Sequence, residues 1–133
     1  MTSSTSLEIE PASVVAYFAA LRENDPHAWA AALAVDAEGH DPAGTPPLIG
    51  REAFVEFLTA FIPRWGRFDG LREDEVFVSG DAVAVRWTGG GASALGTSVT
   101  FSGINIFLLD ADGLISKFYS VFDLASNVAK LGS

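Results

Sequence analysis

The spacing of apolar residues changes at about residue 67, and no other feature constrains the fold of this chain as strongly. Before that point, apolar side chains recur every three or four residues, as they do on one face of a helix. After it they alternate with polar residues, as they do on a half-buried strand. The chain therefore predicts an α+β domain in which helices come first and pack on one face of an antiparallel sheet.

Three segments of the first half carry apolar stripes at helical spacing and are predicted to be helices: residues 11–21, 27–35 and 51–62. Proline marks their boundaries, because Pro11 and Pro26 suit a first helical turn and Pro63 stops the third helix. Between the second and third helices, a short extended stretch over 37–41 leads into a proline-rich loop.

Turn residues divide the second half of the chain into strands. Ser79–Asp81 and Asp110–Gly113 are short turns rich in Gly and Asp, and Gly89–Gly91 is expected to form a looser hairpin end. The strands predicted between these turns form an antiparallel meander and cover residues up to 78, 83–87, 97–109 and 114–122.

The composition fits one globular domain. A chain of 133 residues can bury a single core, and 49% of its residues are hydrophobic whereas 19% are charged. We expect residues 1–10, which are rich in Ser and Thr, to be disordered and residues 11–133 to form the domain. Ten Phe and three Trp exceed what solubility requires, which indicates a pocket or an interface.

Charge and residue counts argue against several classes of function. Eight basic against seventeen acidic residues give a net charge of -9, which repels nucleic acid and anionic lipid. The absence of cysteine excludes disulfides and thiolate chemistry, and two histidines make the usual zinc sites hard to build. The first ten residues lack the parts of a signal peptide, and no apolar run is long enough to span a bilayer. We therefore expect a cytoplasmic protein without nucleic-acid or membrane partners.

Two polar residues are predicted to point into the core. Tyr17 lies in the apolar stripe of the first helix, so its ring faces inward and its hydroxyl needs a hydrogen-bond partner. Asn105 shares a strand face with Phe101 and Phe107, because alternate residues of a strand point to the same side. Each has a simpler explanation on local grounds: a core tyrosine bonded to a backbone carbonyl, and an amide at a bulge or an edge.

The opposite face of the same strand is apolar over its second half, through Ile104, Ile106 and Leu108. An apolar face of this kind is expected to be covered, which predicts a homodimer through the outer face of the sheet. Trp65 and Trp87 have two interpretations, because they can line a pocket for a ring-shaped ligand or belong to the core.

The order and spacing of four short segments resemble the nuclear transport factor 2-like superfamily, in particular its SnoaL-like and ketosteroid isomerase-like members. The segments are Tyr17–Leu21, His40–Gly44, Gly50–Phe54 and Gly103–Phe107, the last of which precedes the Asp112–Gly113 turn. The resemblance covers nearly the whole chain. It implies a cone-shaped α+β barrel, in which three N-terminal helices pack on a curved, mainly antiparallel sheet that encloses a pocket, and it also implies a homodimer.

The resemblance also implies a site. A tyrosine of the first helix and the aspartate of an Asp-Pro turn in the ketosteroid isomerases match Tyr17 and Asp41. Moving a double bond next to a ketone requires a base for the proton α to the carbonyl and donors for the enolate oxygen. Asp41 would be the base and Tyr17 the main donor, with no cofactor. The third isomerase residue, a protonated carboxylic acid, corresponds here to Asn105, whose amide is a permanent but weaker donor.

Three kinds of function stay open at this point. The first is an isomerase-like enzyme acting on a small, hydrophobic, carbonyl-bearing molecule such as a steroid or polyketide. The second is a SnoaL-like cyclase, dehydratase or epoxide-opening enzyme of secondary metabolism, and the third is a non-catalytic protein that binds a hydrophobic ligand. Epoxide opening is disfavoured because Arg86 is predicted to point away from the pocket and no second inward carboxylate is evident. The fold itself does not select among these functions.

Overall fold

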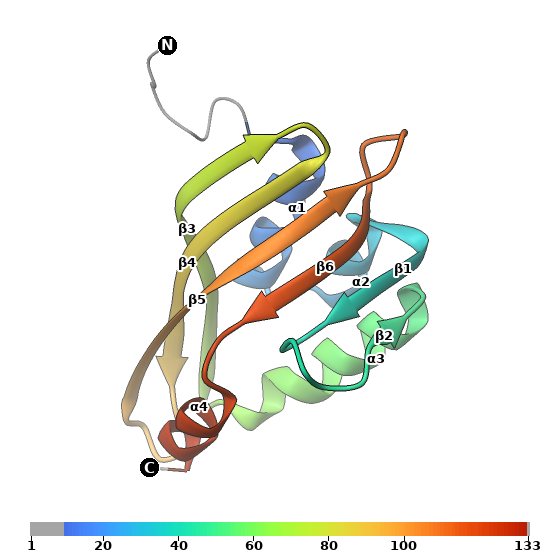
Figure 1. Ribbon diagram of the computed structural model, residues 1–133. Coiled ribbons are helices and arrows are strands. Elements are labelled where there is room, and N and C mark those ends of the chain that lie inside the picture. Colours follow the sequence, from blue (N-terminus) through green and yellow to red (C-terminus); the bar gives the residue numbers. More distant parts are fainter. Residues whose placement is uncertain (1–9, 133) are drawn as a thin grey trace.

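Four α-helices and a short 3-10 helix accompany one curved sheet in the computed structural model of the protein, which describes residues 10–132 (Figure 1). The helical elements are α1 (Ala12–Arg22), α2 (Pro26–Ala31), α3 (Arg51–Phe61), η2 (Ile62–Arg64) and α4 (Leu124–Leu131). The strands are β1 (Leu33–His40), β2 (Leu48–Ile49), β3 (Arg67–Ser79), β4 (Ala82–Ala92), β5 (Ser98–Leu109) and β6 (Ile115–Val121).

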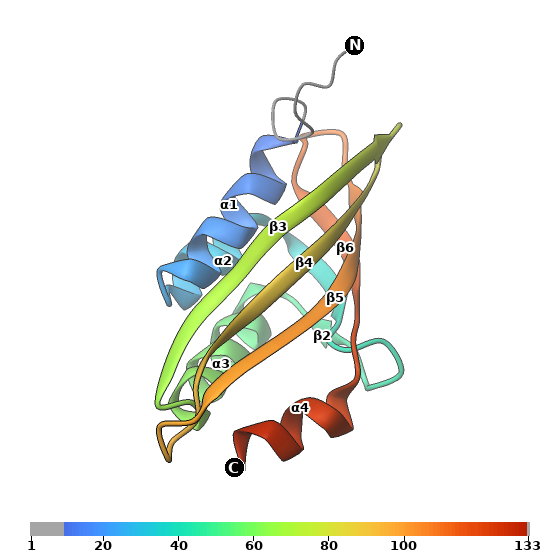
Figure 2. The same ribbon diagram turned by 90° about the vertical axis from the view of Figure 1, so that its left-hand side faces the viewer.

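The six strands lie in the order β2-β1-β6-β5-β4-β3. All neighbours pair antiparallel except β1 and β6, which pair parallel, so the sheet is mixed and mostly antiparallel. The sheet curves without closing, and α1, α2 and α3 cover its inner face (Figure 2). The predicted α+β cone with a mainly antiparallel sheet is confirmed, and the predicted meander corresponds to β3 through β6.

Two of the three predicted helices are confirmed, and the second was predicted too long. The sequence predicted a helix over 27–35, but α2 ends at Ala31 and β1 already begins at Leu33. Leu33 pairs with Ile115 of β6, and its carbonyl accepts two hydrogen bonds from the Arg51 side chain. A short apolar run fits a buried helix and a buried strand equally well, so its periodicity could not separate the two.

The glycine run Gly89–Gly91 was predicted to be a loose hairpin end, and this prediction is wrong. The three residues lie inside β4 and pair with β5, while the connection between the strands follows Ala92. A Cβ atom at Gly90 would overlap the carbonyl of Val99, and one at Gly91 would overlap the carbonyl of Arg67. Glycine is needed here because neighbouring backbones approach closely, and not because the chain turns.

The helix α4 was missing from the sequence prediction. Asp123 is its N-cap and accepts a hydrogen bond from the Ser126 backbone N–H, and Gly132 follows its last residue. An N-cap aspartate, apolar residues at helical spacing and a closing glycine together predict a helix, so the pattern was present in the sequence.

The predicted disorder of residues 1–10 concerns mainly residues 1–9, which lie outside the described residues. Glu10, the remaining residue of that segment, is buried. Within the described part of the chain, no helix is both long enough and apolar enough to cross a membrane.

Candidate active site

A cavity of about 520 Å³ lies between the helices and the inner face of the sheet. This volume is within the range typical of small-molecule sites. Its wall is mostly apolar and includes eight aromatic side chains besides Tyr17: Trp29, Phe57, Phe61, Trp65, Phe68, Trp87, Phe101 and Phe122. The polar lining residues are Tyr17, Thr45, Ser120, Asn127 and two of opposite charge, Asp41 and Arg64. Trp65 and Trp87 are thus both buried in the core and part of the cavity wall.

Tyr17 reaches this cavity from α1 and is 1% exposed. Its ring packs edge-on against Phe107 and Phe118, with centroids 4.9 and 5.4 Å away. The hydroxyl oxygen accepts a hydrogen bond from Asn105 Nδ2 at 3.1 Å. A phenol that accepts one bond still has its own proton to donate, so Tyr17 can act as a donor toward a bound ligand.

Asn105 lies on β5 and is fully buried. Its Oδ1 accepts a hydrogen bond from Trp87 Nε1 at 2.9 Å, and its Nδ2 donates to Tyr17. Because an indole N–H can only donate, Trp87 determines which end of the amide faces Tyr17. Asn105 points inward as its parity predicted, but it lies behind Tyr17 and Trp87 and is absent from the described residues that line the cavity.

Asp41 follows the last residue of β1 and lines the same cavity as Tyr17. The parallel pairing of His40 with Tyr119, and a backbone hydrogen bond from Ala43 N to Ser120 O at 2.7 Å, hold this part of the chain against β6. Burial raises the pKa of the Asp41 carboxyl to about 6, although a hydrogen bond with Ser120 lowers it. The carboxyl is therefore ionised at neutral pH, yet basic enough to accept a proton.

The two side chains influence each other. Burial raises the pKa of the Tyr17 hydroxyl well above its ordinary value, and the negative charge of Asp41 raises it further, although hydrogen bonding to Asn105 and Ser120 opposes both effects. Tyr17 accordingly keeps its proton over the whole physiological range. The structure thus brings together, in one cavity, a carboxylate that can accept a proton and a phenol that keeps its proton and can donate a hydrogen bond.

A family model of the SnoaL-like domain matches residues 14–118, which is well over half of the chain. The chain belongs to the SnoaL-like domain family. This finding confirms the resemblance that the four sequence segments indicated.

Two solved structures share the fold of this SnoaL-like domain. A crystal structure of TerC co-crystallised with polyporic acid has a TM-score of 0.79 at 21% identity and covers 96% of this chain and 98% of that chain. A hypothetical protein from Catenulispora acidiphila with a ketosteroid isomerase-like fold, in complex with trimethylamine, has a TM-score of 0.78 at 20% identity, and the coverages are 92% and 93%. At such identities the likeness shows the fold alone. No curated protein matches the chain.

Next to Tyr17 and Asp41 in this SnoaL-like domain lies a polar residue that sequence reasoning missed, Ser120. It lies on β6 directly opposite Asn105, lines the cavity and is 3% exposed. Hydrogen bonding to Ser120 lowers the pKa of both Tyr17 and Asp41, so its hydroxyl lies within reach of the two groups. Its inward parity with Phe118 was visible in the sequence, but its position opposite Asn105 depends on a register that only the folded sheet reveals.

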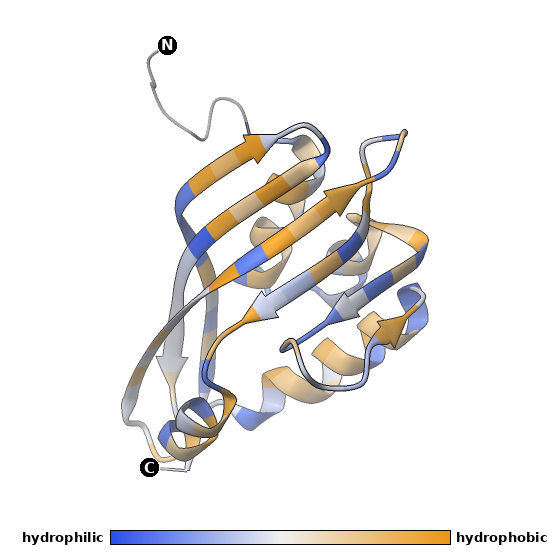
Figure 3. Ribbon diagram, viewed as in Figure 1, coloured by the Kyte–Doolittle hydropathy of each residue, from blue (hydrophilic) through white to orange (hydrophobic). Residues whose placement is uncertain are grey.

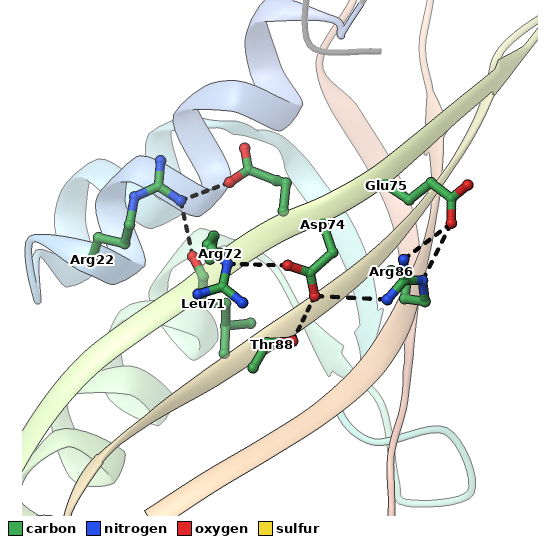
Figure 4. Close-up of polar contacts among 8 residues, drawn as sticks. Arg22, Leu71, Arg72, Asp74, Glu75, Arg86 and Thr88 are labelled. Carbon is green, nitrogen blue, oxygen red and sulfur yellow. Dashed lines mark hydrogen bonds and ion pairs between the residues drawn. The ribbon is translucent and has the colours of Figure 1, made fainter. Parts of the chain in front are cut away.

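Other polar residues of the domain lie outside the cavity. His40 Nε2 is 2.7 Å from Glu38 Oε2, and its ring stacks on Tyr119. Arg86 is exposed, is not among the residues that line the cavity, and donates to Glu75 within a network of charged and polar side chains on β3 and β4 (Figure 4). Among residues 10–132, His, Asp and Glu form no group of three or more that could hold a metal ion.

Proposed function

We propose that this SnoaL-like protein is a cofactor-independent isomerase that moves a proton α to a carbonyl of a small hydrophobic substrate of the steroid or polyketide class. The observation that carries the proposal is that the Asp41 carboxyl and the Tyr17 hydroxyl line one apolar cavity. A half-buried carboxylate with a pKa of about 6 suits a general base at neutral pH, and a phenol that keeps its proton suits an oxygen donor.

The proposed reaction starts with a ketone whose double bond lies one carbon away from conjugation. The Tyr17 O–H donates a hydrogen bond to the ketone oxygen, and Asp41 removes a proton from the carbon between the ketone and the double bond. The electrons of the broken C–H bond form an enolate, whose negative oxygen Tyr17 stabilises. Protonated Asp41 then returns the proton to the far carbon of the original double bond, which leaves a conjugated ketone and the carboxylate.

Asn105 supports this reaction through Tyr17. Its Nδ2 donates to the phenol oxygen, and this polarises the O–H bond toward the substrate because linked hydrogen bonds strengthen one another. The predicted role of Asn105 as a direct donor to the substrate stays a prediction. Its amide is hydrogen-bonded to Tyr17 through Nδ2 and to Trp87 through Oδ1.

A second candidate is cyclisation, and membership of the SnoaL-like family favours it. The same base and donor would generate the same enolate, which would attack a second carbonyl of the substrate in place of being reprotonated. The two reactions require the same residues and differ in whether the substrate carries that second carbonyl at the right distance. The polar groups near Asp41 do not distinguish them.

The test is an ultraviolet assay with 5-androstene-3,17-dione that follows formation of the conjugated ketone. We expect turnover by the native chain and a loss of about 10²–10⁴-fold in kcat for Asp41→Asn, the range typical of a general base. Binding of the product, measured by calorimetry, should survive the substitution. Equal turnover by both proteins would contradict the role of Asp41. Binding without turnover by the native chain would favour a cyclase, a dehydratase or a non-catalytic binder.

We also propose that the protein forms a homodimer through the outer face of its sheet. Four outward side chains there are at least 38% exposed: Phe77, Ile104, Leu108 and Val121. Figure 3 shows hydrophobic residues in orange along much of β5, which crosses the middle of this face. Light scattering during size-exclusion chromatography should give twice the mass of the 14.0 kDa chain, and Ile104→Asp should give the monomer. A native monomer at micromolar concentration would refute the dimer. A cytoplasmic location stays a prediction.

A further inference from the structure

One basic side chain has no polar partner among the residues that the structure describes. The chain has eight Lys and Arg residues, and all lie within the described part of the chain. Seven of them donate to a carboxylate or a backbone carbonyl: Arg22, Arg51, Arg67, Arg72, Arg86, Lys117 and Lys130. The eighth, Arg64, forms no hydrogen bond or ion pair with the described residues, although the chain carries a net charge of -9. Arg64 lines the cavity.

Arg64 and Asp41 come to the cavity from near opposite edges of the sheet. Arg64 is the last residue of η2 and directly precedes the edge strand β3, whereas Asp41 follows β1 near the opposite edge. Strands β6, β5 and β4 lie between them. The two charged groups therefore belong to separate parts of one cavity.

Two further donors on residues that line the cavity also have no partner among residues 10–132. Trp65, the next residue, is 6% exposed, and its Nε1 is buried without a hydrogen-bond partner among residues 10–132. The Nδ2 of Asn127 is also buried without a hydrogen-bond partner among residues 10–132. Asn127 belongs to α4, which lies below the sheet in Figure 2, at the end where α3 finishes. Both residues line the cavity. An indole N–H can only donate, so this region lacks an acceptor.

An unpartnered buried donor is costly, which makes a missing acceptor the simplest explanation of this region. Asp41 is the one carboxylate among the described lining residues, and it lies in the other part of the cavity. The guanidinium of Arg64 favours an acceptor that is anionic and has two oxygens, because its N–H groups match a carboxylate in pairs. The cavity wall next to Arg64 includes the ring of Trp65, which contacts Phe61, Phe68 and Phe101, and this suits flat apolar rings.

We propose that Arg64, Trp65 and Asn127, hereafter the Arg64 end of the cavity, bind a carboxylate carried by the ligand whose carbonyl meets Tyr17 and Asp41. The ligand class is then a hydrophobic keto acid, with rings between its two polar ends. This inference rests on the proposed function for the ligand's carbonyl, and it adds the carboxylate as a second ligand group that the protein recognises. Arg64 is a specificity-determining residue and takes no part in proton transfer.

The test compares three steroids that share a 3-keto-4-ene ring system and differ at carbon 17. These probes are androst-4-en-3-one, androst-4-ene-3,17-dione and 3-oxoandrost-4-ene-17β-carboxylic acid, and their binding to the native chain is measured by isothermal titration calorimetry. We expect the carboxylate to bind about tenfold more tightly than the steroid without a group at carbon 17, as one charge-assisted contact would produce. The ratio should fall at high salt, because Arg64 is exposed.

Two variants separate the role of Arg64 from a general charge effect. Arg64→Gln should remove the preference for the carboxylate while leaving the affinity for androst-4-en-3-one within about twofold, because only one ligand reaches the guanidinium. Arg67→Gln is the matched control. This exposed arginine lies three residues away, pairs with Asp69 and does not line the cavity, so its loss should leave the preference intact.

Three results would overturn the proposal: equal affinity of the native chain for the three steroids, a preference that persists in Arg64→Gln, or no binding of any of them. These outcomes are distinct from failure of the proposed isomerase. Turnover of 5-androstene-3,17-dione without a carboxylate preference would support the proposed isomerase and contradict the carboxylate subsite. A carboxylate preference without turnover would support the carboxylate subsite and contradict the proposed isomerase.

Discussion

The two ends of the cavity differ in how their polar atoms are satisfied. At the Asp41 end, Trp87 donates to Asn105, Asn105 donates to Tyr17, and Ser120 is within reach of both Tyr17 and Asp41. One buried donor there, the Nε1 of Trp29 beside Tyr17, has no partner among residues 10–132. At the Arg64 end, the buried Trp65 Nε1 and Asn127 Nδ2 and the exposed guanidinium of Arg64 have no acceptor among the described residues. Yet both ends share one aromatic wall.

The difference indicates two kinds of task. Proton transfer requires groups held in place before the substrate arrives, and a chain of hydrogen bonds between buried side chains provides that order. Binding of a ligand group far from the reacting atoms tolerates small side-chain movements. The donors that bind it can therefore lack a partner until the ligand supplies the acceptor. The comparison predicts that substitutions at the Asp41 end affect turnover and stability, whereas those at the Arg64 end affect mainly affinity.

The largest contrast is expected between two conservative aromatic substitutions. Tyr17→Phe removes the donor to the enolate oxygen and should lower kcat by about 10²–10³-fold, as the loss of one oxyanion donor does. Trp65→Phe removes an N–H at the other end and should leave kcat for 5-androstene-3,17-dione within about threefold. Steady-state kinetics of the two variants check this contrast. Similar losses in both would contradict the division of the cavity.

A smaller contrast concerns the two asparagines. Asn105→Leu leaves Trp87 Nε1 without its acceptor in a dry core, and should lower the free energy of unfolding by about 1–3 kcal/mol. Asn127→Leu removes an amide nitrogen that is already unpartnered and should be neutral or slightly stabilising. Urea denaturation followed by tryptophan fluorescence measures both. The idea that the Arg64 end is unsatisfied fails if Asn127→Leu destabilises the protein as much as Asn105→Leu does.

The pH dependence sharpens the comparison further. Burial raises the pKa of Asp41 to about 6, so kcat/KM should rise with pH through about 6 and then level off, because the base must be ionised. A raised carboxyl pKa has the opposite effect on stability. The protonated form folds more favourably, so this contribution is fully present below pH 3.8 and is lost as the pH rises through about 6.

Asp41→Asn is the matched variant for this pH effect. It should unfold at a higher temperature than the native chain at pH 8 and show a smaller difference at pH 4, as thermal denaturation at both values would record. A native chain that is at least as stable as the variant at pH 8 would argue against a desolvated carboxyl.

Sequence reasoning succeeded where the outcome depended on a few neighbouring residues. The helical stripe placed Tyr17 inside, and strand parity did the same for Asn105. It failed at residues 32–35, where a short apolar run fits a helix or a strand, and at Gly89–Gly91, where close strand contact looks like a turn in sequence. Both failures have one cause, because the deciding contacts come from strands distant in the chain.

The sequence by itself determined the order of helices and strands, the inward position of Tyr17 and Asn105, and the family, because these depend on local spacing and short segments. The tertiary structure decided which atoms meet. Parallel pairing of β1 with β6 brings Asp41 beside Ser120, and pairing of β5 with β4 and β6 places Asn105 between Trp87 and Ser120. Strand register follows from the packing of the whole sheet, which no local pattern encodes.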